Sequence, residues 1–490
     1  MYSANCPSCG AQVNFRSAAS VMAVCEYCRS TLVKEAGAVR DIGKMADCLE
    51  DYSPLRIGVS GNFDKRRFTL VGRIQLRYEA GFWNEWYVLF DDGTPGWLSD
   101  ASGQYVFTLP AGRVENAPPF TQLQPGLRYT RENVIWHAAD VRSARCTGGS
   151  GELPFAVGAG WEAKVADFRA GERFLTLDYS DSAVPDLYIG RAVELDQLQC
   201  QLLRGDDEIA ETAGRYRGKT QSLECPNCGG SLNYQVGQAV NLMCPSCHAE
   251  VDASEDRAVV LAKHDEIETL ATTLSLGDNG NISGTAWKVI GLMKCRETDS
   301  DETSEWVEYL LFNARLGFGW LVESSEGWER VAVMNAWPDV PSEQAVQLGG
   351  KTYTQLYRYG SQVIYAAGAF NWRVSLGDRV MITDFRGPDG KISAERSANE
   401  ITWSLARPVP AQQIAQWFGK KALVDAPLAR PQADSGSLKG LAWVFTILLL
   451  FLNVPLAMFA ESDGLVIIVF ALLFLWLPVL VLSRLDGRRG

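Results

Sequence analysis

CPSCGAQVNFRSAASVMAVCEYC, residues 6–28, contains two Cys-x-x-Cys pairs, and the same arrangement returns at residues 225–247 as CPNCGGSLNYQVGQAVNLMCPSC. The four cysteines of the first stretch reappear at one constant offset, since Cys6 corresponds to Cys225 and Cys28 to Cys247. A whole motif that returns at a fixed offset indicates an internal duplication. These stretches therefore bear on both the chemistry and the architecture of the chain.

The spacing Cys-x₂-Cys-x₁₅-Cys-x₂-Cys is typical of a zinc ribbon. Four thiolates surround Zn²⁺ in a tetrahedron, and a site with four protein ligands has no open position for a substrate, so such a site is structural. Two disulfides per module or an iron–sulfur cluster are the alternatives, and a reducing cytoplasm disfavours the disulfides. We expect two structural zinc sites, formed by Cys6, Cys9, Cys25 and Cys28 and by Cys225, Cys228, Cys244 and Cys247.

The duplication extends well beyond the cysteines. Gly72 corresponds to Gly291 at the same offset, and further on the tripeptide Gly-Trp-Leu at 96–98 returns at 319–321. Asp-Phe-Arg at 167–169 likewise returns at 384–386. We expect the aspartate and arginine of each tripeptide on one strand face and the phenylalanine in the core, with contact to a ligand or partner as the alternative. The chain is predicted to be two copies of one long unit.

Each unit is expected to contain a helical stretch followed by a β-rich body. Ile42, Met45 and Leu49 recur at helical spacing, and residues 259–270 are the counterpart in the second unit. In the body, Phe68, Leu70, Ile74 and Leu76 fall between polar residues in the pattern of a half-buried strand, and Trp86, Val88 and Phe90 continue it up to an Asp-Asp-Gly turn at 91–93. Short apolar helices are predicted near residues 195–202 and 412–418.

The block VGRIQLRY at 71–78, followed by EWYVLFDDG at 85–93 and Trp97-Leu98, resembles a bacterial family called domain of unknown function 4178. A second copy resembles it at 289–291, 308–312 and 319–321, without the Asp-Asp-Gly turn. The resemblance implies two tandem family domains, each preceded by a zinc-ribbon module. It implies no biochemical activity, and suggests an association with bacterial gene sets linked to membrane stress and polyamine metabolism.

The C-terminal region carries two uncharged, mostly apolar stretches, 440–460 and 464–483. Each is long enough to cross a bilayer core of about 30 Å, so we expect a transmembrane α-hairpin that contacts the lipid bilayer. Lysines and arginines flank both outer ends while the short loop between the stretches is acidic, which predicts that both termini are cytoplasmic at a bacterial inner (cytoplasmic) membrane. A re-entrant hairpin is the alternative.

Composition limits the classes of function. The formal net charge is −12, and a strongly acidic chain repels the phosphates of nucleic acids. The first ribbon is mildly basic and the second is acidic, and two copies of one nucleic-acid-binding module should not differ in the sign of their charge. We therefore expect no nucleic-acid binding. If the protein does bind nucleic acid, the first ribbon is the expected site. The sequence has no Gly-x-Ser-x-Gly, P-loop or His-Glu-x-x-His motif, and we assign no catalytic and no cofactor-binding residue.

These patterns predict a mainly β, multi-domain protein. Its parts are zinc ribbon 1 (1–34), a helical linker and β-rich module 1 (35–205), zinc ribbon 2 (222–252), a helical linker and β-rich module 2 (253–420), a flexible linker (421–438) and the transmembrane hairpin (439–484). The leading hypothesis is a membrane-anchored, cytoplasm-facing, non-enzymatic scaffold with unidentified protein partners. The alternatives are an enzyme or ligand-binding protein that uses a cleft in a β-module, and nucleic-acid binding through the first ribbon.

Overall fold

The structure is a computed structural model of the chain. It describes residues 2–16, 20–35, 38–44, 48, 53–79, 81–101, 103–157, 161–205, 208–209, 225–229, 241–244, 246–247, 249–252, 259–262, 272–298, 304–313, 316–420 and 446. Two compact units divide the chain, Met1–Val424 and Asp425–Gly490. The β-structure lies in the first unit, and the fold below is that unit's.

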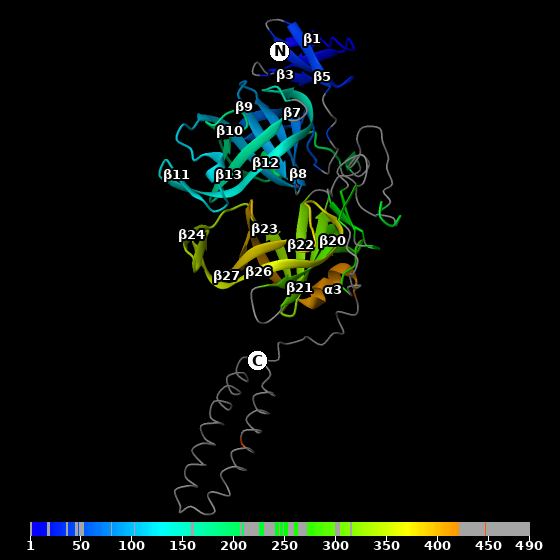
Figure 1. Cartoon of the computed structure of the whole chain (residues 1–490), viewed down its shortest axis with the longest axis vertical. Helices are drawn as coiled ribbons and strands as arrows, with labels where there is room; N and C mark the ends of the chain where they lie inside the picture. Colours follow the sequence, from blue (N-terminus) through cyan, green and yellow to red (C-terminus); the bar gives the residue numbers. More distant parts are fainter. Residues whose placement is uncertain are drawn as a thin grey trace, which may run out of the picture. The chain divides into compact units, whose positions relative to one another are not determined.

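The first β-rich body is a closed antiparallel barrel of eight strands (Figure 1). Its strands in spatial order are β12 (Val134–Leu153), β13 (Glu162–Ala170), β14 (Arg173–Asp178), β15 (Asp186–Val193), β10 (Gln104–Arg113), β9 (Pro95–Ala101), β8 (Gly81–Phe90) and β7 (Arg66–Tyr78). β7 pairs back onto β12, which closes the ring. Closure leaves these strands without a free sheet edge.

The second body repeats this order strand for strand. It contains β26 (Lys351–Phe370), β27 (Arg379–Gly387), β28 (Gly390–Arg396), β29 (Ile401–Val409), β23 (Gly327–Val333), β22 (Gly317–Ser324), β21 (Glu305–Asn313) and β20 (Thr285–Glu297), with β20 paired back onto β26. The two β-rich bodies are therefore tandem copies of one barrel, as the repeated sequence predicts.

The remaining elements extend or cover the barrels. Hairpin and edge strands are β6 (Ser60–Phe63), β11 (Arg128–Arg131), β19 (Asn279–Ile282), β24 (Asp339–Ser342) and β25 (Ala345–Leu348). The cysteine modules contribute β1 (Tyr2–Asn5), β2 (Gln12–Phe15), β3 (Met22–Val24), β4 (Ser30–Glu35) and β5 (Ala38–Lys44), and in the second copy β16 (Asn241–Met243), β17 (Glu250–Asp252) and β18 (Val259–Ala262). The helices are η1 (Phe120–Gln122), α1 (Leu195–Leu198) and α3 (Ala411–Phe418).

Each barrel closes where two glycines cross. A Cβ on Gly72 of β7 would lie 1.7 Å from the carbonyl oxygen of Glu152 on β12, and Gly151 beside it has a φ of +71°. In the second barrel, a Cβ on Gly291 would lie 2.7 Å from the carbonyl oxygen of Ala369. Side chains at these positions would separate the two strands that complete the ring, so glycine is required there.

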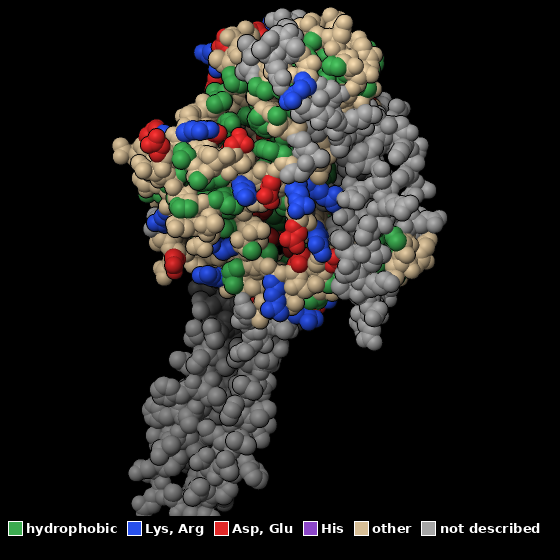
Figure 2. Space-filling view, turned by 45° about the horizontal axis from the view of Figure 1, so that its top comes forward, with side chains coloured by type: hydrophobic (Ala, Val, Ile, Leu, Met, Phe, Trp, Pro, Cys, Tyr) green, Lys and Arg blue, Asp and Glu red, His purple; other side chains and the backbone are tan. Residues whose placement is uncertain are grey.

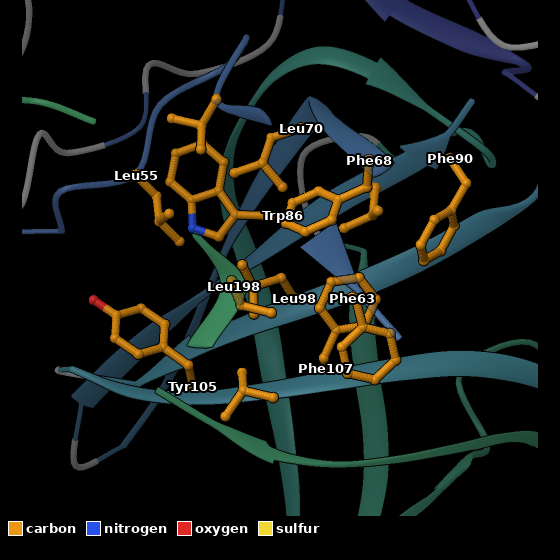
Figure 3. Close-up of a cluster of buried hydrophobic side chains, with 13 residues drawn as sticks. Leu55, Phe63, Phe68, Leu70, Trp86, Phe90, Leu98, Tyr105, Phe107 and Leu198 are labelled. Carbon is orange, nitrogen blue, oxygen red and sulfur yellow. The ribbon is translucent and has the colours of Figure 1, made fainter. Parts of the chain in front are cut away.

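A cluster of aromatic side chains fills the space between the first barrel and the segment that covers it. Figure 3 shows this cluster, in which Phe63 and Phe107 stack with ring centroids 3.9 Å apart and Phe68 meets Phe107 edge-on at 5.3 Å. Leu198 of α1 packs into the same cluster. The second barrel has the counterpart, where Phe418 of α3 packs with Trp287 and Val289. The short apolar helices predicted after each body therefore cover the barrels.

The predicted strands are confirmed, but a bulge between Leu70 and Gly72 puts Phe68 and Leu70 in one hydrophobic cluster and Ile74 and Leu76 in another, so the four do not share one face. Phe68–Leu76 lies in β7 and Trp86–Phe90 in β8, and Asp-Asp-Gly at 91–93 turns between β8 and β9. The alternation predicted that the polar face of β7 is exposed to solvent, but Arg73 and Gln75 are buried. Arg73 Nε donates a hydrogen bond to Oδ1 of Asn84 at 2.9 Å, which satisfies the buried guanidinium.

The helical linkers predicted after each cysteine module are wrong where the structure describes them. Residues 38–44 form strand β5, paired with β4, and residues 259–262 form strand β18, paired with β17. A short apolar run is compatible with both the helical and the strand periodicity, and here hydrogen bonds to a neighbouring strand favour the strand. The rest of 45–52 and 263–271 falls almost entirely outside the described residues.

Among the described residues, no helix is both long and apolar enough to cross a membrane. The two stretches predicted to do so, 440–460 and 464–483, lie outside the described residues except for Thr446. The membrane hairpin stays a prediction.

Candidate metal centres and barrel interiors

The first cysteine quartet forms one compact cluster. Cys6 and Cys25 are buried, Cys28 is half-buried and Cys9 is exposed. The Sγ atoms of Cys6 and Cys28 are 3.5 Å apart, those of Cys9 and Cys25 are 3.7 Å apart, and all four lie within 4.8 Å of one another. Residues 22 positions apart in the sequence therefore meet at one point.

The second quartet has the same geometry. The Sγ atoms of Cys225 and Cys247 are 3.6 Å apart, and those of Cys228 and Cys244 are 3.8 Å apart. Its burial follows the first cluster residue for residue. The eight cysteines singled out by spacing are thus brought together as two groups of four.

Backbone turns hold each pair of cysteines. The amide of Gly10 donates to the carbonyl oxygen of Cys6 at 2.8 Å, and the amide of Arg29 donates to that of Cys25 at 2.9 Å. Gly10 and Arg29 have φ values of 79° and 63°, which place both in the left-handed region. In the second copy, Gly229 donates to Cys225 in the same way. These turns point the two thiols of each pair in one direction.

The distances fit a tetrahedral thiolate site. With Zn–S bonds near 2.3 Å, the sulfur atoms of a regular tetrahedron are about 3.8 Å apart. The Sγ–Sγ distances given above, 3.5 and 3.7 Å in the first cluster and 3.6 and 3.8 Å in the second, agree with this value. Both clusters therefore have the ligand type, number and spacing that could hold a tetrahedrally coordinated metal ion.

One thiol in each cluster has a lowered pKa. A hydrogen bond to the Ser30 hydroxyl, together with the Ser30 amide, lowers the pKa of Cys28 to about 6. At Cys247 burial raises the pKa, but the Asn227 amide and nearby groups outweigh burial and lower it to about 6. Because the thiolate is the metal ligand, these are the cysteines that first offer a charged sulfur.

The first cysteine module is joined to its barrel by main-chain and side-chain bonds. β3 pairs with the end of β12, with Met22 opposite Leu153. The carboxylate of Glu152 accepts hydrogen bonds from the amide of Arg16 at 2.6 Å and the hydroxyl of Ser20 at 2.9 Å. The Arg29 guanidinium donates to the carbonyl oxygen of Gly149. In the second copy β16 pairs with β26, so both metal modules continue the sheet of the barrel that follows them.

The register places a set of polar side chains inside the first barrel. Paired residues share a face, so Glu85 lies on the same face as Ser99, and Asp167 on the same face as Thr176 and Tyr188. Burial raises the pKa of the Glu85 carboxyl, and the charge of Asp167 raises this pKa further, although β7 and β12 separate the two strands. Across a curved sheet only the inner face allows this approach, and we infer that these residues face the interior.

Glu85 and Asp167 accept hydrogen bonds from neutral donors, whereas Asp140, which lies opposite Asp167, pairs with Arg142. Glu85 accepts hydrogen bonds from Ser99 Oγ at 2.7 Å and Trp83 Nε1 at 2.8 Å, and Asp167 accepts one from Thr176 Oγ1 at 2.7 Å. Burial raises the pKa of Glu85 to about 7 and that of Asp167 to about 6. Asp178, on the same face of β14, also has a raised pKa because of burial.

The second barrel keeps the same three acidic positions. The register equates Glu85 with Glu308, Asp167 with Asp384 and Asp178 with Glu395. Trp306 Nε1 donates to Glu308 at 2.7 Å, as Trp83 does to Glu85. Ser393 Oγ donates to Asp384 at 2.6 Å, as Thr176 does to Asp167. Burial raises the pKa of Glu395 to about 7.

One interior residue differs sharply between the copies. Lys391 of β28 pairs with Arg386, and in the first barrel Phe174 of β14 pairs with Arg169 at the equivalent position. The Lys391 ammonium lies 2.8 Å from Glu329 Oε2 and 3.6 Å from Asp384 Oδ2. The second barrel therefore has a lysine ammonium beside Asp384, whereas the first barrel has the aromatic ring of Phe174 at the equivalent position.

The paired Asp-Phe-Arg tripeptides have the arrangement that the sequence predicts. Phe168 and Phe385 are buried in hydrophobic clusters, and the aspartates lie on the opposite face. Sequence reasoning missed Glu85, Glu308 and Lys391. The available signal for Glu85 and Glu308 was their recurrence at equivalent alternating positions, whereas Lys391 has no lysine counterpart in the first copy.

Fold and site together define a class: tandem eight-stranded β-barrels, each preceded by a four-cysteine metal module. The family described as Domain of unknown function (DUF4178) matches residues 56–195 and 275–411, one match per barrel. These matches cover more than half of the chain, and the protein belongs to that family. No curated protein and no solved structure matches the chain.

Proposed function

We propose that the protein is a membrane-anchored, cytoplasm-facing, non-enzymatic scaffold whose two barrel modules are fastened by Zn²⁺. The observation that carries the proposal is the pairing of β3 with β12 and of β16 with β26, which joins each cysteine module to its barrel. A closed four-thiolate zinc site offers structural support and no position for a substrate. The metal therefore stiffens a surface rather than performing a reaction.

Two similar modules in one chain favour multivalent contact with partners. When two modules are linked, binding of the first raises the effective concentration of the second at its partner. A membrane anchor at 440–460 and 464–483 would restrict these contacts to partners at the inner membrane surface. Both termini would then face the cytoplasm. On the face drawn in Figure 2, acidic and basic side chains of the described residues lie among one another and form no continuous basic patch, which supports protein partners over nucleic acid.

Cross-linked co-purification tests the scaffold role. Tagged full-length protein is cross-linked in cells, extracted from membranes and compared with a tag-only control. We expect a defined set of proteins to be enriched, and to be lost in the double variant Cys25→Ser, Cys28→Ser because the first module loses its metal. Recovery of no enriched protein, or recovery of the protein itself from the soluble fraction after lysis, would contradict the proposal.

Metal analysis tests the zinc assignment separately. Purified full-length protein should contain close to two zinc ions per chain by plasma mass spectrometry. The double variant should retain about one, because only one of the two four-cysteine sites is removed. Iron with a visible absorption band, or no metal at all, would overturn the assignment.

A further inference from the structure

The second barrel docks on a stretch of β12 that the ring closure does not use. Strand β12 pairs with β11 at its start and with β7 only from Cys146 onward. Between these pairings, the amide of Val141 donates a hydrogen bond to the carbonyl oxygen of Asn399 at 2.9 Å. Beside this bond, the guanidinium of Arg142 pairs with the carboxylate of Glu400 at 2.6 Å. This strand edge therefore holds a backbone carbonyl and the carboxylate that follows it.

A neighbouring turn of the first barrel extends this docking face. The carbonyl oxygen of Gly171, in the turn between β13 and β14, accepts a hydrogen bond from the amide of Trp337 at 2.8 Å. The guanidinium of Arg169, close to that turn, donates to the carbonyl oxygen of Asn335. The first barrel thus uses two arginines and its own backbone groups to hold acceptors of the second barrel.

The strand register identifies the equivalent face on the second barrel. Val141 of β12 and Arg358 of β26 occupy the same place, because each pairs with the residue that directly precedes the Asp-Phe-Arg tripeptide of its barrel. The tripeptides themselves equate Arg169 with Arg386. The turns that follow them, between β13 and β14 and between β27 and β28, also correspond. The docking face of the first barrel therefore has a counterpart on the second.

This counterpart has an open strand edge. On that side, β26 bonds to Gln344 through the amide of Gln355 and to the amide of Thr298 through the carbonyl oxygen of Gly360. Backbone groups two residues apart point to the same side of a strand, so the amide and carbonyl of Arg358 point there as well. Between these two bonds, no strand in the described part of the chain pairs with β26 on that side.

The side chains around this edge favour an acidic partner. Tyr357 is 60% exposed, and Arg358 and Arg386 are exposed on the adjacent strands β26 and β27. Neither arginine forms an ion pair with the residues that the structure describes. The carboxylate of the neighbouring turn, Asp389, is already paired with Lys351 at 2.7 Å. Tyrosine and arginine are enriched at protein interfaces, and the two arginines would attract carboxylates of a partner.

We propose that the edge of β26 at residues 357–359 is a docking site for an acidic, extended segment of a partner protein. The segment adds to this edge as a short strand, a common mode of peptide recognition, and its carboxylates pair with Arg358 and Arg386. A second copy of the chain does not fit this role, because the groups that fill the equivalent edge, Asn399 and Glu400, are already bound within each chain. The inference rests on the proposed scaffold function and names the surface on which a partner docks.

Fluorescence anisotropy with full-length protein in a mild detergent tests the inference. The probe is a short labelled peptide in which glutamate and threonine alternate. The comparisons are the same peptide with lysine in place of glutamate, an acidic peptide interrupted by prolines that cannot extend a strand, and a short single-stranded DNA. We expect saturable binding of the acidic peptide at one site per chain and no saturable binding of the comparisons.

Two outcomes would overturn the proposal. One is the absence of saturable binding of the acidic peptide, and the other is equal binding of the lysine peptide, the proline peptide or the DNA. If the peptide does not bind while cross-linked co-purification still enriches partner proteins, this surface is rejected and the scaffold role stands. A co-purification without enriched proteins rejects the scaffold role itself.

Variants locate the docking site. The double variant Arg358→Glu, Arg386→Glu should weaken binding of the acidic peptide at least tenfold and should bind the lysine peptide instead, because the attraction is reversed. Tyr357→Ala should weaken binding several-fold. The double variant Lys65→Glu, Arg67→Glu reverses two exposed charges on the first barrel and is the matched control, which should bind as the wild type does. Circular dichroism establishes that each variant is folded. Unchanged binding in Arg358→Glu, Arg386→Glu would refute the assignment.

Discussion

Replacement of Glu85 by glutamine should change how stability depends on pH. Burial raises the pKa of Glu85 from its usual 4.5 to about 7, because the enclosed carboxylate is costly to ionise. The folded chain therefore holds a proton that the unfolded chain releases. This contribution to stability is fully present below pH 4.5, falls as the pH rises and is lost above about pH 7.

The size of the effect follows from the pKa difference. At 1.36 kcal/mol per pKa unit, a change from 4.5 to about 7 corresponds to roughly 3 kcal/mol of unfolding free energy lost between pH 4.5 and pH 8. Glu85→Gln has the same shape without the charge and keeps an acceptor for Trp83 and Ser99. The variant should therefore be more stable than the wild type at pH 8, by up to about 3 kcal/mol, and nearly equal to it at pH 4.5.

Urea unfolding followed by circular dichroism at half-unit pH intervals measures this difference. Glu172→Gln is the control, because it removes an exposed carboxylate of the same type. The wild-type and Glu85→Gln curves should converge toward acid and separate toward alkali. Parallel curves over the whole range would show that Glu85 is solvated in the folded chain, and would refute the interior position argued from the register.

Three further outcomes follow from the described contacts. Cys25→Ser should remove the metal from the first module and leave one metal ion per chain, with loss of thermal stability measured by calorimetry. Gly72→Ala should cost at least about 2 kcal/mol in urea unfolding because its Cβ would overlap a β12 carbonyl, whereas Gly205→Ala, which meets nothing within 4 Å, should be neutral. Lys391→Met should cost about 3–5 kcal/mol in the same unfolding measurement, since it leaves the buried Asp384 carboxylate without its cation, and a loss below about 1 kcal/mol would contradict that cause.

The metal centres could be predicted from the sequence because their information is local. Cys6 and Cys9 are held by one turn, and the chemistry of thiolates leaves few uses for four of them at this spacing. The strands could be predicted for a similar reason, since alternation at Phe68–Leu76 depends on neighbours along the chain. The duplication predicted that both copies share one fold.

The barrel closure and its interior could not be predicted in this way. Closure depends on β12 meeting β7, segments about 70 residues apart, and nothing local at Gly72 or Gly151 identifies the partner. The alternation in the sequence predicts that Arg73 faces solvent. In the structure Arg73 is buried against Asn84, because elements distant in sequence cover that face of β7. Asp167 and Glu85 likewise become neighbours only once the ring is closed.

The pairing of β3 with β12 has a consequence for the state without metal. The end of β12 is hydrogen-bonded to β7 on one side and to β3 on the other. If loss of metal loosens the cysteine module, the outer side of β12 becomes an uncovered strand edge with free amide and carbonyl groups. Such edges recruit strands from other molecules. Metal supply during synthesis would then decide whether the protein stays monodisperse or aggregates, and the same holds for β16 on β26.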